Sequence, residues 1–374
     1  MFRFGVVALW LGSLYAQTQP NPEALWKEAV TLHQQGKLSE AIEDYRQLVK
    51  MYPDQPQLRS NFGAALAGSG RYAEAIEQYQ KAIAIHPDPK VRLNLALAYY
   101  KETEFQPAIE ELTKVHQELP DDKQAAMLLA DSNLQLGRNK EVIRILQPLY
   151  KASPKDLAIS YMLGTALVRD GQTAEGQVVI DPILKNGDSA EARLLMGMTK
   201  MSVNDFAGAR DDLKRAVELN PNLPDVDSYY GSALLATGDQ PGAEKAFEQE
   251  LAHNPNNFDA NLRMGVLLKQ NDEFDKALQH FQRALRTRPG DLAVRFQIAS
   301  VLVAQSHLDE ARVQLEQIVK ESPNFTEAHV TLATVYYRQK RKADGDKERQ
   351  IVAKLTAERQ AKEPGVKQSD TRAK

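Results

Sequence analysis

The strongest constraint on the fold of this chain is a proline that recurs at an almost constant interval along the sequence. The marks are Pro53, Pro87, Pro120, Pro154, Pro221, Pro255, Pro289 and Pro323, and Asp188 stands where one further mark is expected. Self-similarity at a fixed period of roughly 20–50 residues is typical of solenoid arrays. The chain is therefore predicted to form one long repeat array rather than several unrelated domains.

Each period also carries small residues in two phases and a large apolar residue in a third. Gly or Ala stands at a constant distance before each mark, at Ala29, Gly63, Ala96, Ala130, Gly164, Gly197, Gly231, Gly265 and Ala299, and Ala333 continues the phase. A second, mostly small residue follows in each repeat, and one helical turn after it stand Tyr45, Tyr79, Leu112, Leu146, Ile180, Leu213, Phe247, Phe281 and Leu315. Small residues let two helices approach closely, and a residue one turn on lies on the same helical face. The pattern predicts pairs of antiparallel helices.

The turn between the two helices of a pair falls at a residue suited to left-handed backbone. Glycine occupies this phase at Gly36, Gly70, Gly137, Gly171 and Gly238, and Asn204 and Asp272 are the next best residues for that conformation. Thr103 and Ser306 suit it less well, so those two turns are expected to differ in shape. The recurring proline ends the second helix because it cannot donate a backbone hydrogen bond.

Together these positions resemble the tetratricopeptide repeat, most clearly at Phe62-Gly63, Leu163-Gly164, Tyr230-Gly231 and Met264-Gly265. The resemblance implies an all-α, right-handed superhelical solenoid with about nine full repeats over residues 22–343 and a last first helix near residues 326–339. Residues 344–362 are predicted to form a polar capping helix, and residues 363–374 a disordered tail. The fifth repeat, with Gly176 and Asp188 off pattern, is expected to pack more loosely or to kink.

The N-terminus has the layout of a secretory signal peptide. Met1 to Arg3 is a short positive start, twelve mostly apolar residues follow, and Ala16 precedes a polar linker at residues 17–21. Twelve residues are fewer than the roughly 20 that span a bilayer as a helix. Residues 1–16 thus predict a periplasmic or secreted protein. The alternative is a membrane-anchored protein in which Leu14 prevents cleavage after Ala16.

In relatives, the first helices line a concave groove that binds extended peptides or other proteins, so the resemblance implies such a groove here. Among its expected residues are Asn61, Lys90, Asn94 and Tyr100. Asn61 and Asn94 hold equivalent positions in successive repeats, and an amide can both donate to and accept from a peptide backbone. The alternative is that asparagine is simply common at this position.

The middle of the predicted groove is apolar and rich in methionine. Its residues are Met127, Tyr161, Met162, Leu194, Met198 and Met201. Methionine is flexible and polarisable, and it is frequent on surfaces that adapt to apolar ligands. These residues predict a surface for an amphipathic or apolar segment of a partner. The alternative is that several of them pack between neighbouring repeats.

The composition argues against catalysis and against nucleic-acid binding. A formal net charge of −3 gives no concentrated basic character, cysteine is absent, and the seven histidines are dispersed without metal-binding spacing. No phosphate-binding loop or nucleophile elbow occurs. We therefore expect a protein without catalytic residues, cofactor or metal, which binds protein or peptide partners in an envelope assembly. A permanent oligomer formed through the convex face or the cap is the alternative.

One basic cluster stands at the end of the last repeat, at Arg338, Lys340, Arg341 and Lys342. A solvated helix C-terminus is the plain interpretation, because cations there complement the helix dipole. The sharper interpretation is contact with an anionic lipid surface or an acidic partner, so an association with the envelope membrane is kept open.

Overall fold

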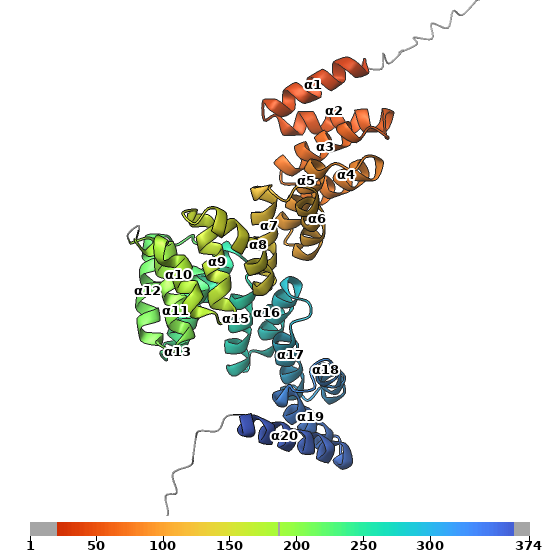
Figure 1. The fold of residues 1–374 in the computed structure, drawn as a ribbon. Helices are drawn as coiled ribbons and strands as arrows, with labels where there is room; N and C mark the ends of the chain where they lie inside the picture. The colour runs from red at the N-terminus through yellow and green to blue at the C-terminus, as the bar shows by residue number, and fades with distance from the viewer. Residues whose placement is uncertain (1–20, 186–187, 363–374) are drawn as a thin grey trace, which may run out of the picture. The chain divides into compact units, whose positions relative to one another are not determined.

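The computed structural model describes residues 21–185 and 188–362, which form twenty α-helices and contain no strand (Figure 1). The prediction of an all-α array of helix pairs is confirmed over these ranges. The predicted signal segment at residues 1–16, all but the last residue of the linker at 17–21, and the predicted disordered tail at 363–374 lie outside the described residues.

First helices and second helices alternate along the chain. The first helices are α1 (Pro22–Gln34), α3 (Pro56–Gly68), α5 (Pro89–Lys101), α7 (Lys123–Gln135), α9 (Leu157–Arg169), α11 (Ala190–Ser202), α13 (Val226–Ala236), α15 (Phe258–Gln270), α17 (Leu292–Ala304) and α19 (Thr326–Arg338). The second helices are α2 (Leu38–Met51), α4 (Tyr72–Ile85), α6 (Phe105–Glu118), α8 (Asn139–Ala152), α10 (Thr173–Lys185), α12 (Phe206–Leu219), α14 (Gln240–His253), α16 (Phe274–Thr287), α18 (Leu308–Glu321) and α20 (Lys342–Lys362). Nine pairs thus precede the tenth, whose second helix α20 includes residues 344–362, for which a capping helix was predicted.

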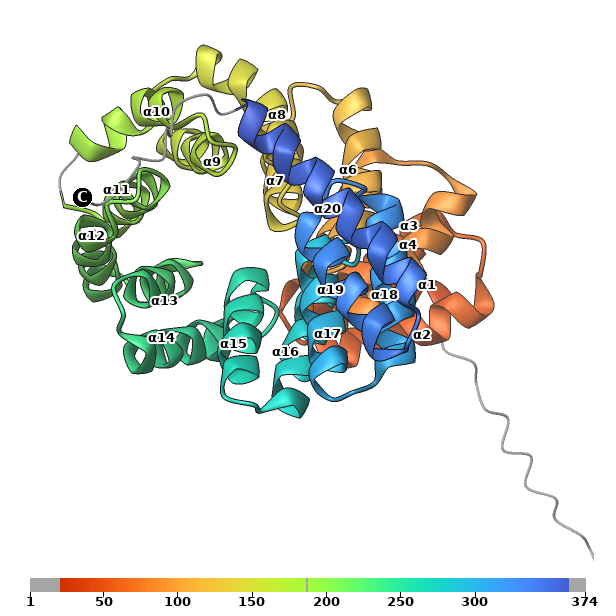
Figure 2. The same cartoon turned by 90° about the horizontal axis from the view of Figure 1, so that it is seen from below.

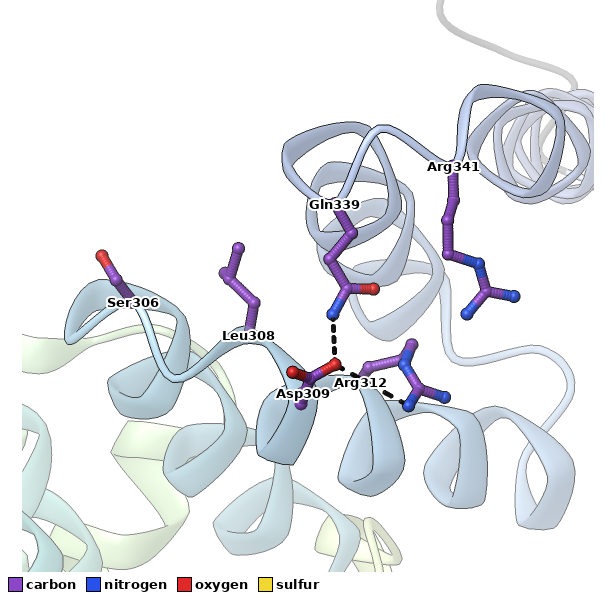
Figure 3. Close-up of a pocket in the computed structure, with 6 residues that line it drawn as sticks. All are labelled: Ser306, Leu308, Asp309, Arg312, Gln339 and Arg341. Atoms are coloured by element: carbon purple, nitrogen blue, oxygen red, sulfur yellow. Dashed lines mark hydrogen bonds and ion pairs between the residues drawn. The ribbon is translucent and has the colours of Figure 1, made fainter.

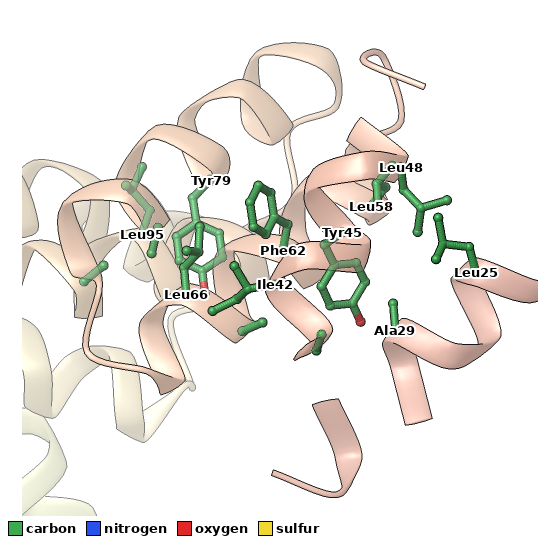
Figure 4. Close-up of a cluster of buried hydrophobic side chains, with 14 residues drawn as sticks. Leu25, Ala29, Ile42, Tyr45, Leu48, Leu58, Phe62, Leu66, Tyr79 and Leu95 are labelled. Atoms are coloured by element: carbon green, nitrogen blue, oxygen red, sulfur yellow. The ribbon is translucent and has the colours of Figure 1, made fainter. Parts of the chain in front are cut away.

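The small residue of each first helix lies against the large residue of its second helix. At Gly63, an added Cβ atom would come within 2.7 Å of the Tyr79 ring, so only glycine leaves room for that ring. Tyr45 and Tyr79 are both buried in the core that α1 to α5 share (Figure 4). The predicted close approach at this phase is the main packing contact inside a pair.

Every turn inside a pair has one residue with positive φ. In five turns this residue is glycine, and its φ ranges from 71° at Gly137 to 90° at Gly238. Thr103 and Ser306 have φ of 61° and 66°, so the expectation that their turns differ in shape is wrong. At the second of these turns the amide of His307 donates to the carbonyl of Leu302, a closing bond that fixes the left-handed residue between them.

The chain divides into two compact units. Unit 1 comprises the chain up to Glu102 together with Glu110–Pro120. Unit 2 comprises Thr103–Ile109 together with the chain from Asp121 onward. In unit 2, successive first helices contact one another, and Figure 2 shows α9, α11, α13 and α15 on the inside of an arc with α10, α12 and α14 outside. The inner face of unit 2 is therefore built from first helices, as the repeat pattern implies.

Candidate functional site

Unit 1 presents an accessible stripe of polar side chains on two contacting first helices. Asn94 on α5 is exposed, and Asn61, at the equivalent position of α3, is half-buried and accepts a hydrogen bond from Gln57 Nε2 at 3.0 Å. Lys90 is exposed one turn before Asn94, and Leu97 is 38% exposed one turn after it. Helical spacing places these residues on one side of α5. Tyr100 is half-buried on the same helix.

The apolar residues predicted for the middle of the groove are covered to different extents. Leu194 and Met198 are only 1% and 3% exposed and belong to the core of α9 to α13, so for these two the alternative of packing holds. Tyr161 and Met201 are half-buried against the same core. Met127 and Met162 are half-buried as well. A role in partner binding for these six residues stays a prediction.

Sequence reasoning did not single out a part-buried charged cluster that joins α9 to α13, two repeats apart. The guanidinium of Arg169, at the end of α9, donates from Nε to the hydroxyl of Tyr229 at 2.8 Å and from Nη2 to Asp225 Oδ2 at 3.0 Å. Its Cζ atom lies 5.5 Å from the centre of the Tyr229 ring. Burial lowers the pKa of Arg169, but Tyr229 and Asp225 outweigh burial and the pKa is raised. Arg169 is thus a cation at all ordinary pH values.

The opposite side of this cluster is assembled by α13, α14 and α15. Asp225 precedes α13 in the left-handed conformation, with φ of 66°. Its Oδ1 accepts from Asn257 Nδ2 at 2.7 Å, and the same nitrogen donates to Glu250 Oε1 at 2.9 Å. Asn257 in turn caps α15 by accepting from the amide of Ala260 at 2.9 Å. Asp225 is therefore held in place by a hydrogen-bond network that does not involve α9.

Glu250 stands on α14 where an aliphatic residue fits the repeat pattern, and the structure gives the reason. Its carboxyl group accepts from the backbone amides of Asp225 and Ser228 at the start of α13, which is shorter than the other first helices. The group thus satisfies amides that a helix start leaves without partners. Burial and the nearby Asp225 raise the pKa of Glu250 to about 7.

A second arginine in unit 2, Arg288, connects helices that are far apart in sequence. Arg288, just after α16, donates from Nε to the carbonyl of Gln135 at 3.0 Å, the last residue of α7. Its guanidinium lies 3.8 Å above the centre of the Phe258 ring. A cation on the last carbonyl of a helix also complements the helix dipole. The end of α16 and the end of α7, 153 residues apart in sequence, are thus joined by this side chain.

The predicted basic cluster borders a polar pocket of about 530 Å³ between the turn before α18 and the turn before α20 (Figure 3). Its lining includes Arg312 and Arg341, but both already have partners. Arg312 pairs with Glu316 at 2.9 Å, and Arg341 pairs with Asp344 at 2.7 Å while stacking over Tyr336. Arg338 donates to the carbonyl of Val303. Within the predicted basic cluster, Arg341 is thus neutralised by Asp344, and Arg338 is held by the neutral carbonyl of Val303.

Two features are absent from residues 21–185 and 188–362. In these ranges no group of three or more His, Cys, Asp or Glu side chains is placed to hold a metal ion. In the same ranges no helix combines the length and the apolar character needed to cross a membrane.

Comparisons with known proteins agree with the repeat geometry. Two family models described as tetratricopeptide repeat match, one at residues 11–56, 27–88, 194–250 and 231–291, and the other at residues 267–329. A model described as anaphase-promoting complex, cyclosome, subunit 3 matches residues 68–149. No curated protein matches the chain. Among solved structures, a monomeric mutant of IFIT1 with Gppp-AAAA is similar at a TM-score of 0.48 and 16% identity, over 90% of each chain.

Proposed function

Because the chain is a tetratricopeptide repeat protein, and such repeats generally mediate protein–protein interaction, we propose that it is a non-catalytic scaffold of the cell envelope that binds an extended segment of a partner on the first helices of unit 1. The observation that carries this proposal is the accessible stripe of Asn61, Lys90, Asn94 and Leu97. The envelope setting rests on the signal-like residues 1–16.

The stripe has the chemistry to hold a peptide backbone. Asn61 and Asn94 belong to helices that contact one another, and each amide offers both donors and an acceptor. Leu97 adds an apolar contact, and Lys90 together with the exposed Lys101 favours a segment that carries acidic side chains. The inner face of unit 2 is less suitable, because Leu194 and Met198 are buried there and Arg169 and Arg288 bridge across it.

The test combines cross-linking with affinity measurement. A photoreactive side chain at position 94 is expected to cross-link one envelope protein, and one at position 47, an exposed site on the second helix α2, is expected not to. A peptide from the cross-linked segment then binds the purified protein. Asn61→Ala with Asn94→Ala removes two hydrogen-bonding amides, each contributing about 1 kcal/mol, and should weaken binding by roughly tenfold or more. Equal binding by this variant and by the Gln47→Ala control would disprove the proposed surface.

The proposed location has its own test. Export of the full chain, and loss of export when residues 2–16 are deleted, is the expected outcome of cell fractionation. A protein that stays in the membrane fraction after carbonate washing would favour the uncleaved anchor.

A structural subunit is the second candidate, and the last helix pair favours it. Val330 on α19 and Ile351 on α20 are 49% and 37% exposed, beside a pocket of about 410 Å³ lined in part by Tyr337 and Val352. In the preceding pairs of unit 2 the equivalent face is covered by the next first helix. Light scattering decides: an oligomer that Ile351→Glu converts to monomer supports this role, and a wild-type monomer rejects it.

A further inference from the structure

Arg169 of α9 is bound at the start of α13 by two hydrogen bonds and a ring contact, all made by its guanidinium group. We propose that the inner face around the start of α13 is a guanidinium-binding site, occupied in this structure by the chain's own Arg169, and that an arginine of a partner protein competes for it. This goes beyond the proposed function, because it concerns unit 2 and a different chemical group.

The site is built without the help of the arginine that fills it. Asp225 is fixed by Asn257, and Asn257 is fixed by its bonds to Glu250 and to the start of α15. Tyr229 projects from the first turn of α13. When Arg169 leaves, this arrangement is expected to persist with a part-buried carboxylate and no cation bonded to it, which is energetically unfavourable. The vacated site is therefore expected to bind another cation.

The geometry selects a guanidinium rather than an ammonium group. Two different nitrogens of Arg169 reach two acceptors, the Tyr229 hydroxyl at 2.8 Å and Asp225 Oδ2 at 3.0 Å, and the planar group also contacts the ring of Tyr229. A lysine ammonium has one nitrogen and cannot make this forked contact. The ring that contacts the guanidinium is thus supplied by α13, the same helix start that supplies the two acceptors.

Exchange of the arginine has a structural consequence. Arg169 is the last residue of α9, and its bonds connect two first helices that are separated by α11. A competing arginine that satisfies Asp225 and Tyr229 releases the end of α9 and opens the inner face of the arc. The half-buried Tyr161 and Met162 on α9 then become accessible to the same partner. Arg169 thus acts as an internal competitor that a partner has to displace.

The first experiment tests the site by chemical rescue in the full-length protein. Arg169→Ala is expected to lower the melting temperature, and millimolar methylguanidinium is expected to recover part of that loss, whereas methylammonium at equal ionic strength is not. Arg144→Ala, which removes an exposed arginine paired only with Glu141, is the matched control and should show neither effect. Rescue should disappear when Asp225→Asn is added. No rescue, or equal rescue by both cations, would overturn the assignment.

If Arg169→Ala does not fold, Arg169→Met keeps the aliphatic stem and is tested in the same way.

The second experiment tests competition in the wild-type protein by hydrogen exchange. A short peptide with a single arginine should speed exchange at the end of α9 and leave the start of α13 protected, and the lysine version should not. Identical behaviour with both peptides would refute competition. Neither experiment touches α3 or α5, so its failure leaves the proposed function of unit 1 intact.

Discussion

In five repeats the fourth residue of the first helix makes a polar contact with the second helix 19 residues later. The pairs are Arg59–Gln78, Arg92–Glu111, Arg193–Asp212, Asn261–His280 and His329–Glu348. In three of them the same side chain also contacts the carbonyl oxygen of the proline six residues earlier. One side chain thus ties the loop, the first helix and the second helix together, which an apolar residue at this position cannot do.

Arg59 gives a direct test of this role. It is 9% exposed and donates to the carbonyl of Pro53 at 2.6 Å and to Gln78 Oε1 at 3.0 Å. Arg59→Ala leaves the buried Gln78 and the carbonyl of the exposed Pro53 without their partner and should cost about 2 kcal/mol in the stability of unit 1, measured by urea denaturation. Arg71→Ala, which removes an exposed ion pair with Glu74, should cost well under 1 kcal/mol. Equal losses in the two variants would contradict the assigned role.

Glu250 makes a second prediction at this scale, on the dependence of stability on pH. Its pKa is about 7 in the folded protein and near 4.5 when solvated, so between these values the unfolded chain loses the proton first. The contribution of Glu250 to stability is therefore present below about pH 4.5 and is lost as the pH rises through 7, up to about 3 kcal/mol. Glu250→Gln should reduce the difference between the urea midpoints at pH 5 and pH 8. The pKa of Asp227 is also raised by burial, so the difference should shrink rather than vanish; an unchanged difference would contradict the prediction.

At the scale of a helix pair, the small residue of the first helix is glycine opposite an aromatic ring and alanine opposite leucine in six of the nine full pairs. Gly63, Gly231 and Gly265 face the aromatic rings of Tyr79, Phe247 and Phe281, and a Cβ atom added to any of them would come within 2.5–2.7 Å of a ring carbon. Alanine stands at the same phase where the second helix supplies Leu112, Leu146 or Leu315. Three pairs depart from this relation: Ala29 stands opposite Tyr45, Gly164 opposite Ile180 and Gly197 opposite Leu213. Nothing in the structure explains these three.

A double substitution tests this relation. Gly265→Ala places a methyl group within 2.5 Å of Phe281 and should destabilise the protein by about 1–3 kcal/mol. Adding Phe281→Leu should make the glycine substitution less costly, because leucine is the residue found opposite alanine in other repeats. Urea denaturation of the four variants gives the coupling energy of the cycle. Additive effects would mean that the two residues do not constrain each other. Gly290→Ala, which meets nothing within 4 Å, is the neutral control.

The helix pairs could be predicted because the contact between the small residue of the first helix and the large residue of the second recurs in phase along the sequence. The same reasoning failed at Ser306, where the closing bond from His307 to Leu302 stabilises a left-handed residue that its own preference does not favour. The repeat pattern also left unexplained why Asp188 replaces the recurring proline. In the structure its carboxylate accepts hydrogen bonds from Arg193 and Arg215. The contact of Arg169 with Asp225 joins residues 56 apart, which is not a multiple of the repeat, so no periodicity could reveal it. The signals present in the sequence were Glu250 and the additional proline at Pro224.

At the scale of the whole molecule, the apolar core is a series of local clusters. One cluster joins α1 to α5 in unit 1, another is centred on α11 and α12, and further clusters surround α16 and α18. Each cluster is shared by neighbouring helices and consists of contacts close in sequence. Stability in such an array is approximately a sum of repeat terms and nearest-neighbour terms. A local loss of packing should therefore stay local.

Two matched substitutions distinguish this behaviour from global cooperativity. Tyr79 in unit 1 and Phe281 in unit 2 hold the same place in their repeats, and both are almost completely buried. Replacing a buried aromatic side chain of this kind by alanine costs about 3–5 kcal/mol. Tyr79→Ala should raise hydrogen exchange in α2 to α5 and leave α15 to α18 protected, and Phe281→Ala should show the reverse. Each variant is the control for the other, because the chemistry and the position in the repeat are the same. If either substitution accelerated exchange equally throughout the described helices, the two units would unfold as one, and a partner bound to unit 1 would then stabilise unit 2 as well.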